Sequence, residues 1–161
     1  MPKFSTDYTQ DINTVYAFMT NPETIQKRGE ALGESNIRVQ IDESGGMKTI
    51  TITREVESDL PSFAKKIFNS KNTIVERQEW RDSGDTKTCR SHIDVVGTPG
   101  QIDSNVSLSP KGGGCTYDIE LDVSVKVPLI RKKLEEFVAK TALDGVRDQQ
   151  EYNQRALNAA G

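Results

Sequence analysis

The strongest structural signal in the chain lies in residues 117–146, YDIELDVSVKVPLIRKKLEEFVAKTALDGV. Apolar and polar residues alternate without a break from Tyr117 to Val127, as in a long antiparallel strand with one buried face. Pro128 suits the first position of a helix, and the apolar residues that follow recur every three or four positions. This helical stripe comprises Ile130, Leu134, Phe137, Val138, Ala142, Val146, Tyr152, Ala156 and Leu157. We therefore expect a strand that leads into a helix about 40 Å long, packed across a sheet.

The rest of the chain predicts further strands and two short helices. Lys3 to Thr9 is typical of an opening strand, and Asp11 and Asn21 are suited to cap two helices in tandem, the second ending near Gly33. Beyond that point the apolar period changes to two, and glycine-containing turns separate the segments. We expect strands near residues 37–41, 50–56, 73–80, 88–96 and 102–108, and a short helix at 62–68.

Length and composition limit the classes of protein. The chain has 161 residues, which predicts a single domain over 1–161. Its formal net charge of −3 argues against a nucleic-acid partner. No apolar run approaches the length of a membrane span, and the polar N-terminus lacks the core of a signal peptide. These features favour a cytoplasmic protein without a transmembrane segment.

The cysteines and the histidine do not predict a metal site. Cys89, Cys115 and His92 are the only residues of these types, and they are widely spaced in the sequence. A disulfide between the cysteines is one reading, and free thiols in a reducing cytoplasm are the preferred one. His92 falls on the polar phase of its strand, which predicts a surface histidine.

The order of elements is strand, two short helices, six strands and one long helix. This order resembles the helix-grip fold of the START and Bet v 1-like superfamily, also called SRPBCC. Arg54, Asp59-Leu60-Pro61-Ser62-Phe63, Trp80, Gly97-Thr98-Pro99 and Val127-Pro128-Leu129 are similar to an uncharacterised bacterial family within it. The resemblance implies an α+β fold in which a curved, antiparallel, seven-stranded sheet is covered by the C-terminal helix. It also implies a hydrophobic cavity between them, since members carry lipids, sterols, hormones or polyketides and a minority catalyse reactions such as cyclisation.

The inner face of the predicted C-terminal helix changes along its length. Up to Val138 the stripe is bulky and resembles core, but its centre then runs through Thr141, Gly145 and Gln149, which are small or polar. Glycine in a helix interior costs about 1 kcal/mol relative to alanine. The change in residue type therefore indicates space for a ligand, the close approach of another backbone as in a tight helix–sheet contact, or a simple kink in the helix.

Polar residues share the inward phase of several predicted strands. Arg54 is in phase with Ile50 and Ile52, and Cys89 and Ser91 are in phase with Ile93. A few polar groups in an apolar wall are typical of a ligand site, whereas an edge ion pair or a bulge would give the same pattern. Arg54 pairs with Glu76 in one reading and with a ligand carboxylate in another. The predicted ligand-binding residues are Arg54, Glu76, Gln78, Trp80, Cys89, Ser91, Ser104, Phe137, Thr141, Gly145 and Gln149.

The segment before the fourth strand predicts one side of an entrance to this cavity. Its apolar residues are Leu60, Phe63, Ile67 and Phe68, with Lys65 and Lys66 between them and a basic run at 131–133 nearby in the implied fold. Such a gate suits a transient contact with an anionic membrane surface or the attraction of an anionic ligand. The alternative is a small apolar cluster beside a solvated face.

The sequence shows no catalytic signature. Cys89 has no visible base, and the carboxylates form no obvious pair. We therefore expect a protein without catalytic residues, metal or cofactor that binds or transports a hydrophobic small molecule or lipid. A cyclase or aromatase that uses the same cavity, and a protein-interaction module, are the alternatives.

Overall fold

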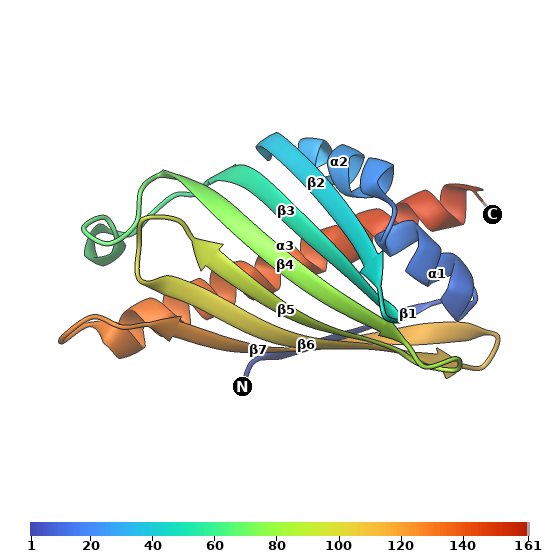
Figure 1. Ribbon diagram of the computed structural model, residues 1–161. Helices are drawn as coiled ribbons and strands as arrows, with labels where there is room; N and C mark the ends of the chain where they lie inside the picture. The colour runs from blue at the N-terminus through green and yellow to red at the C-terminus, as the bar shows by residue number, and fades with distance from the viewer. Residues whose placement is uncertain (161) are drawn as a thin grey trace.

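The computed structural model describes residues 1–160, so Gly161, the last residue of the predicted domain, lies outside the described residues. The elements follow one another in this order (Figure 1): β1 (Lys3–Tyr8), α1 (Ile12–Met19), α2 (Pro22–Ala31), β2 (Ser35–Ser44), β3 (Met47–Glu57), the 3₁₀ helix η1 (Ser62–Ala64), β4 (Lys71–Asp82), β5 (Lys87–Val95), β6 (Gly100–Lys111), β7 (Gly114–Val125) and α3 (Arg131–Ala160).

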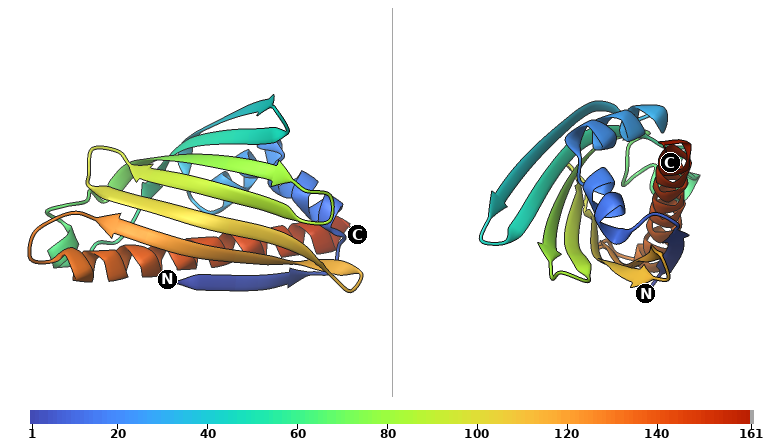
Figure 2. Two further views of the ribbon diagram at one scale, coloured as in Figure 1. Left: turned by 60° about the horizontal axis from the view of Figure 1, so that its bottom comes forward. Right: turned by 90° about the vertical axis from the view of Figure 1, so that its right-hand side faces the viewer.

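The seven strands form one antiparallel sheet in the order β1-β7-β6-β5-β4-β3-β2. β1 therefore pairs with the last strand, and the remaining strands follow as consecutive hairpins. The sheet curls around α3, which runs along its concave side (Figure 2). α1 and α2 lie towards the C-terminal half of α3, whereas η1 lies at the opposite end, beside the first turns of α3 (Figure 1).

The two short helices begin where the sequence predicted. The Asp11 side chain accepts hydrogen bonds from the backbone N–H groups of Asn13 and Thr14, and that of Asn21 accepts one from Glu23. These bonds satisfy N–H groups that have no partner inside the helix. Gly33 has a φ of +88°, which only glycine adopts without strain, and it ends the second helix.

The junction between β7 and α3 differs from the prediction. The strand ends at Val125 and not near Val127, and the helix begins at Arg131 and not at Pro128. The intervening residues form tight turns, in which Ile130 N–H donates to the Pro128 carbonyl. The Glu135 carboxylate accepts a hydrogen bond of 2.9 Å from Val125 N–H and so ties the strand end to the helix. Alternation continues to Val127 in the sequence because Val127 packs against a second apolar cluster after the strand has ended.

The 62–68 segment is also less regular than predicted. Only Ser62–Ala64 is helical, as a 3₁₀ turn, and Phe68 N–H donates to the Ala64 carbonyl just beyond it. The segment is held in position by the burial of Ala64 and Phe68, and not by the hydrogen bonds of a regular helix.

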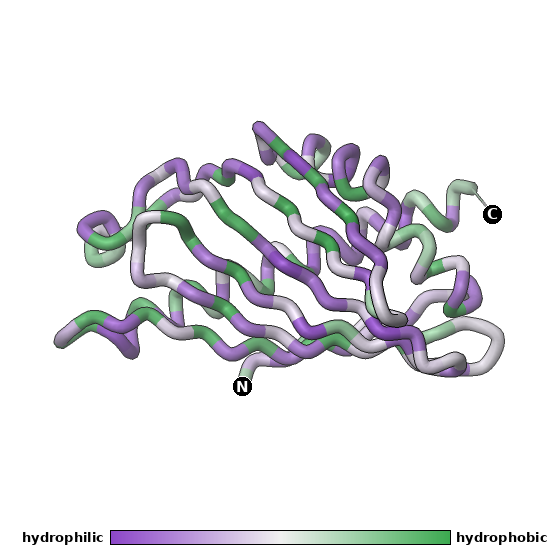
Figure 3. The backbone as a smooth tube through the Cα atoms, in the orientation of Figure 1, coloured by the Kyte–Doolittle hydropathy of each residue, from purple (hydrophilic) through white to green (hydrophobic). Residues whose placement is uncertain are grey.

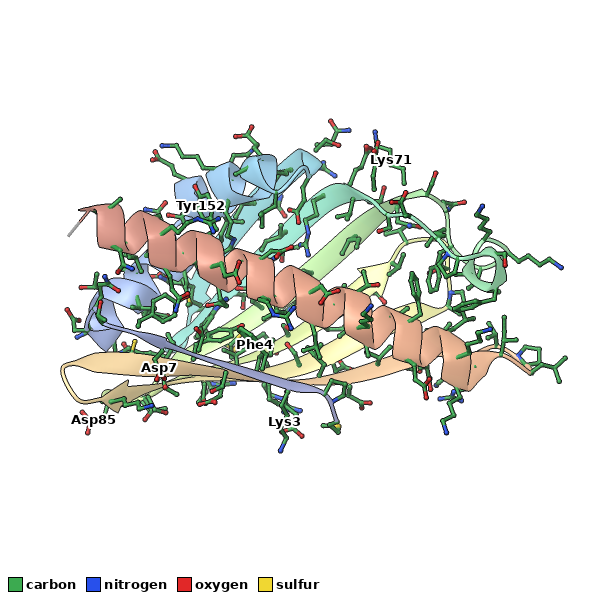
Figure 4. The ribbon with its side chains drawn as sticks, turned by 180° about the vertical axis from the view of Figure 1, so that it is seen from behind. Lys3, Phe4, Asp7, Lys71, Asp85 and Tyr152 are labelled. Atoms are coloured by element: carbon green, nitrogen blue, oxygen red, sulfur yellow. The ribbon has the colours of Figure 1, made fainter. Side chains whose placement is uncertain are left out.

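The helix α3 crosses the sheet (Figure 4) and is buried near both of its ends. Leu134 is buried near its start, and Gln150, Asn153 and Leu157 are buried near its end. No residue between 134 and 150 is buried to that degree in the described chain. Leu143 is partly buried against the core on the side where α3 contacts β1 and β7.

The apolar side chains form two clusters. Hydrophobic and hydrophilic residues alternate along the strands (Figure 3), and the inward set packs with α1, α2 and the end of α3 around Val15, Ile50 and Leu108. A smaller cluster joins the η1 segment to the start of α3 through Phe68, Val125 and Leu134. The main core therefore lies at the α1 end, and α3 is held at the other end by the smaller cluster.

Gly114 provides a test of how β1 closes the sheet. A Cβ added there would lie 1.9 Å from the Tyr8 backbone oxygen, whereas one added at the adjacent Gly113 would meet no atom within 4 Å. Gly114→Ala should therefore lower the free energy of unfolding by about 3 kcal/mol, at the upper end of overpacking effects. Gly113→Ala, which carries the same change in unfolded-state entropy, should leave it nearly unchanged in urea unfolding. Equal stability of the two variants would contradict the close approach of β1.

Candidate functional site

A cavity of about 250 Å³ lies between the concave face of the sheet and α3. Its α3 wall runs from Phe137 to Gln150, a length of about 20 Å at 1.5 Å per residue. The opposite wall comes from inward-facing residues of β3 to β7, and Met19 and Arg28 contribute from the first two helices. The cavity is therefore elongated along the helix and is closed at one end by the main core.

The structure brings the sequence-predicted residues together around this cavity. All eleven predicted ligand-binding residues line it, and so do Leu60 and Phe68 of the predicted entrance. Phe63 and Ile67 do not line it and pack against the smaller apolar cluster. Whether these residues bind a ligand stays a prediction.

Gly145 lies over open space in the roof of the cavity. A Cβ added at this position would meet no atom within 4 Å, so the alternative of a close backbone approach is wrong. Its neighbours on the same face, Thr141 and Gln149, also line the cavity and are not buried. The small and polar centre of the helical stripe thus corresponds to a gap beneath α3.

The polar groups of the sheet wall are arranged by its register. Gln78, Ser91 and Ser104 are direct cross-strand neighbours on β4, β5 and β6, and the two serine hydroxyls hydrogen-bond to each other. Gln78 Nε2 donates to Glu76 Oε2 over 2.7 Å, and Trp80 Nε1 donates to Gln78 Oε1 over 2.9 Å. The wall is therefore an apolar surface crossed by a chain of hydrogen bonds whose members satisfy one another.

Arg54 lies between two carboxylates. Its Nη1 is 3.0 Å from Glu76 Oε1, and its Nε is 3.4 Å from Glu34 Oε2, a contact outside hydrogen-bond geometry. Burial raises the pKa of Glu34, and Arg54 opposes that rise. The structure therefore supports the pairing of Arg54 with Glu76 inside the fold. The alternative of an ion pair at the edge of the sheet is wrong, because β3 lies between β4 and β2. A ligand carboxylate would have to displace two existing partners of Arg54.

Arg28 is a cavity residue that the sequence analysis missed. It is 8% exposed, it lines the cavity, and its Nη1 donates to Asn153 Oδ1 over 3.2 Å. Burial lowers the pKa of its guanidinium. The available signal was its spacing, because Arg28 follows Ile25 by three residues and so shares the buried face of α2.

One buried tyrosine lines the cavity, and a second contacts a residue of the cavity lining. Tyr8 Oη donates to Gln150 Oε1 over 2.5 Å, and Tyr117 is buried in the cavity lining. Burial raises the pKa of Tyr8 to about 12 and also raises that of Tyr117. Both phenols are therefore neutral at physiological pH.

The two cysteines lie inside the fold, and the histidine lies at the surface. Cys89 and Cys115 are both free and buried, and burial raises the pKa of both thiols. His92 is partly exposed between Asp94 and Asp103, and the hydrogen bond to Asp103 raises its pKa. Across residues 1–160, no group of three or more His, Cys, Asp or Glu side chains is placed to hold a metal ion.

The predicted entrance residues meet the start of α3. The rings of Phe63 and Phe137 pack edge to face with centroids 6.0 Å apart, and Lys133 Nζ lies 4.3 Å from the centre of the Phe63 ring. Lys65 and Lys66 are exposed on the same segment. This end of the cavity is thus bounded by apolar side chains with cations around them.

The described helices contain no stretch long and apolar enough to cross a membrane.

Comparison with known proteins gives one family. A model described as protein of unknown function, DUF2505, matches residues 3–157. No curated protein matches the chain.

Solved structures similar to this chain share its fold at low sequence identity. A protein from Thermus thermophilus aligns with a TM-score of 0.67 at 14% identity, covering 99% of this chain and 97% of its own. The allergen Ara h 8.0201 gives 0.57 at 9% identity, covering 94% and 95%. Norcoclaurine synthase from Thalictrum flavum, in complex with dopamine and hydroxybenzaldehyde, gives 0.55 at 11% identity, covering 99% and 87%. The fold is therefore Bet v 1-like, as the order of elements indicated.

The charge arrangement in the cavity predicts unequal effects of two arginine substitutions on β3 and β4. Arg54→Met removes the cation from two largely buried carboxylates and should lower the free energy of unfolding by about 3–5 kcal/mol. Arg77→Met removes an exposed partner of Glu79 and should cost less than about 1 kcal/mol. Adding Glu34→Gln and Glu76→Gln to Arg54→Met should restore part of the loss. Similar urea midpoints for the two single variants would contradict the buried network.

Proposed function

The chain belongs to the DUF2505 family of proteins of unknown function, and we propose that it binds an elongated hydrophobic small molecule beneath α3 without catalysing a reaction on it. The observation that carries this proposal is the unfilled span of α3. The helix is buried at Leu134 and again from Gln150, but Gly145 between them has open space below it. A helix that only completed a core would be expected to fill that space.

The lining of the cavity supports a ligand that is mostly apolar. Aliphatic and aromatic side chains from the sheet and from α3 surround a limited set of polar groups, which is the usual composition of a small-molecule site. A protein of the same fold, norcoclaurine synthase, is seen in complex with two small aromatic molecules. This parallel supports the use of the fold for binding and says nothing about which ligand this chain takes.

The polar groups of the cavity support binding more than catalysis. Glu76, the carboxylate on the sheet wall, already has Arg54 and Gln78 as partners, so a ligand would have to compete with them for its oxygens. Cys89 remains a neutral thiol because burial raises its pKa, and a thiol is a poor nucleophile. A cyclase or aromatase would need an acid or base released from these contacts.

We propose that the ligand enters at the η1 end. Leu60 and Phe68 line the cavity there, and the surrounding lysines suit a transient contact with an anionic membrane surface. The protein is proposed to act as a single domain in the cytoplasm, where the thiols of Cys89 and Cys115 stay reduced.

Native mass spectrometry tests the proposal directly. Protein purified from cells and sprayed under non-denaturing conditions should carry a co-purifying apolar molecule that organic extraction removes. The extracted protein should then bind the lipophilic dye Nile red with a dissociation constant in the micromolar range. A ligand-free spectrum together with an absence of dye binding would refute the proposal.

Gly145→Leu tests where the ligand lies. The leucine side chain would project into the space beneath α3, so Nile red affinity should fall at least tenfold. The free energy of unfolding should not fall, because leucine exceeds glycine in helix propensity by up to about 1 kcal/mol. Asp148→Leu is the matched control, since it adds the same side chain to an exposed position of α3 and should leave dye binding unchanged. Loss of folding in Gly145→Leu would mean that the position is tightly packed, and unchanged dye binding would place the ligand elsewhere.

A further inference from the structure

At the cavity end nearest α1 and α2, the guanidinium of Arg28 has more N–H donors than hydrogen-bond partners. Arg28 is 8% exposed, and within residues 1–160 its only side-chain hydrogen bond goes to Asn153 Oδ1. A guanidinium has several further N–H groups, all of which are donors. Its partner Asn153 is fully buried and does not line the cavity, so the donors that a cavity ligand can reach are those of Arg28.

The carboxylates of the cavity do not accept hydrogen bonds from Arg28 within residues 1–160. Glu34 and Glu76 both form their ion pairs with Arg54, and Glu76 also accepts from Gln78. Among residues 1–160, no ion pair joins either of them to Arg28. Glu76 and Glu34 attract the Arg28 guanidinium without contacting it, but burial outweighs this attraction and lowers its pKa, so the cost of burying Arg28 is only partly offset.

The position of Arg28 relative to the apolar end gives the cavity a direction. Arg28 bonds to Asn153 near the end of α3, whereas Phe137 and Phe68 line the opposite end. The α3 wall between these ends, from Phe137 to Gln150, is about 20 Å long at 1.5 Å per residue. Between them the cavity passes beneath Gly145 and is lined by apolar side chains such as Val138 and Ile102.

We propose that the ligand is an amphiphile with a terminal carboxylate, which binds Arg28, and a hydrocarbon chain that runs beneath Gly145 towards Phe137. This inference rests on the proposed function and adds the chemical class of the ligand. A carboxylate matches the planar guanidinium with two oxygens and supplies the acceptors that Arg28 lacks. The hydrocarbon chain accounts for the apolar walls and the length of the cavity.

The test compares three ligands with the same chain length. Dodecanoate, methyl dodecanoate and dodecanol are titrated into extracted protein by calorimetry near neutral pH. Dodecanoate should bind at least about tenfold more tightly than the two neutral ligands, the size expected for a charge-assisted hydrogen bond. This comparison uses the unaltered protein and needs no variant to fold.

Two variants then assign the preference to a residue. Arg28→Met should reduce dodecanoate binding to the level of the neutral ligands and leave the binding of those ligands within about threefold of the original. Arg38→Met makes the same change of charge at an exposed position of β2 and should keep the full preference. If Arg28→Met fails to fold, Arg28→Lys, which keeps the charge but loses the planar fork, should weaken the preference.

The outcomes separate the two proposals. Equal affinity for the acid and the neutral ligands, or a preference that survives in Arg28→Met, would overturn the carboxylate assignment and leave the hydrophobic cavity standing. Absence of binding by all three ligands and by Nile red would overturn the proposed function, and the carboxylate assignment with it.

Discussion

The structure depends on how α3 spans the concave sheet. A helix gains most of its stability in a protein from packing, and α3 obtains this packing at two separated places. Near its start, Leu134 is enclosed by the smaller apolar cluster, and near its end Asn153 and Leu157 are enclosed beside β1 and α1. The sheet is curved between these anchors, so the inner face of α3 around Gly145 stands away from it. The cavity is the consequence of a rigid helix held at both ends over a curved surface.

The same arrangement explains how the cavity tolerates charge. Buried ionised groups need partners, and Arg54 obtains them from β4 and from the residue that precedes β2. Because Gln78 and Trp80 continue the chain of hydrogen bonds, the wall stays polar in one band without leaving those groups unpaired. Arg28 differs, since its protein contacts leave donors unused, and this difference is what connects the architecture to a ligand with acceptors.

Much of this site could be predicted from the sequence because two regular geometries fix side-chain directions. The parity of a strand places Gln78 and Trp80 on the same face, and the rotation of 100° per residue places Thr141 and Gly145 over the gap. The remainder depended on tertiary contacts. Glu34, which pairs with Arg54, comes from a loop with no periodic signal in the sequence. Arg28 lies in a short helix, and in the sequence a single buried cation of such a helix cannot be distinguished from a solvated one. The start of α3 was predicted three residues early. Val127 and Ile130 are apolar because they pack in the smaller cluster, and the sequence pattern does not distinguish this packing from the stripe of a helix.

The central claim is that the space under α3 is the ligand site. A titration of isotopically labelled protein with dodecanoate, followed by two-dimensional NMR, tests it residue by residue. The account predicts that chemical-shift changes concentrate on cavity-lining residues such as Ile102, Val138 and Gly145, while residues on the convex face, such as His92, stay unchanged. Shift changes confined to the outer surface, or none at saturating ligand, would contradict it.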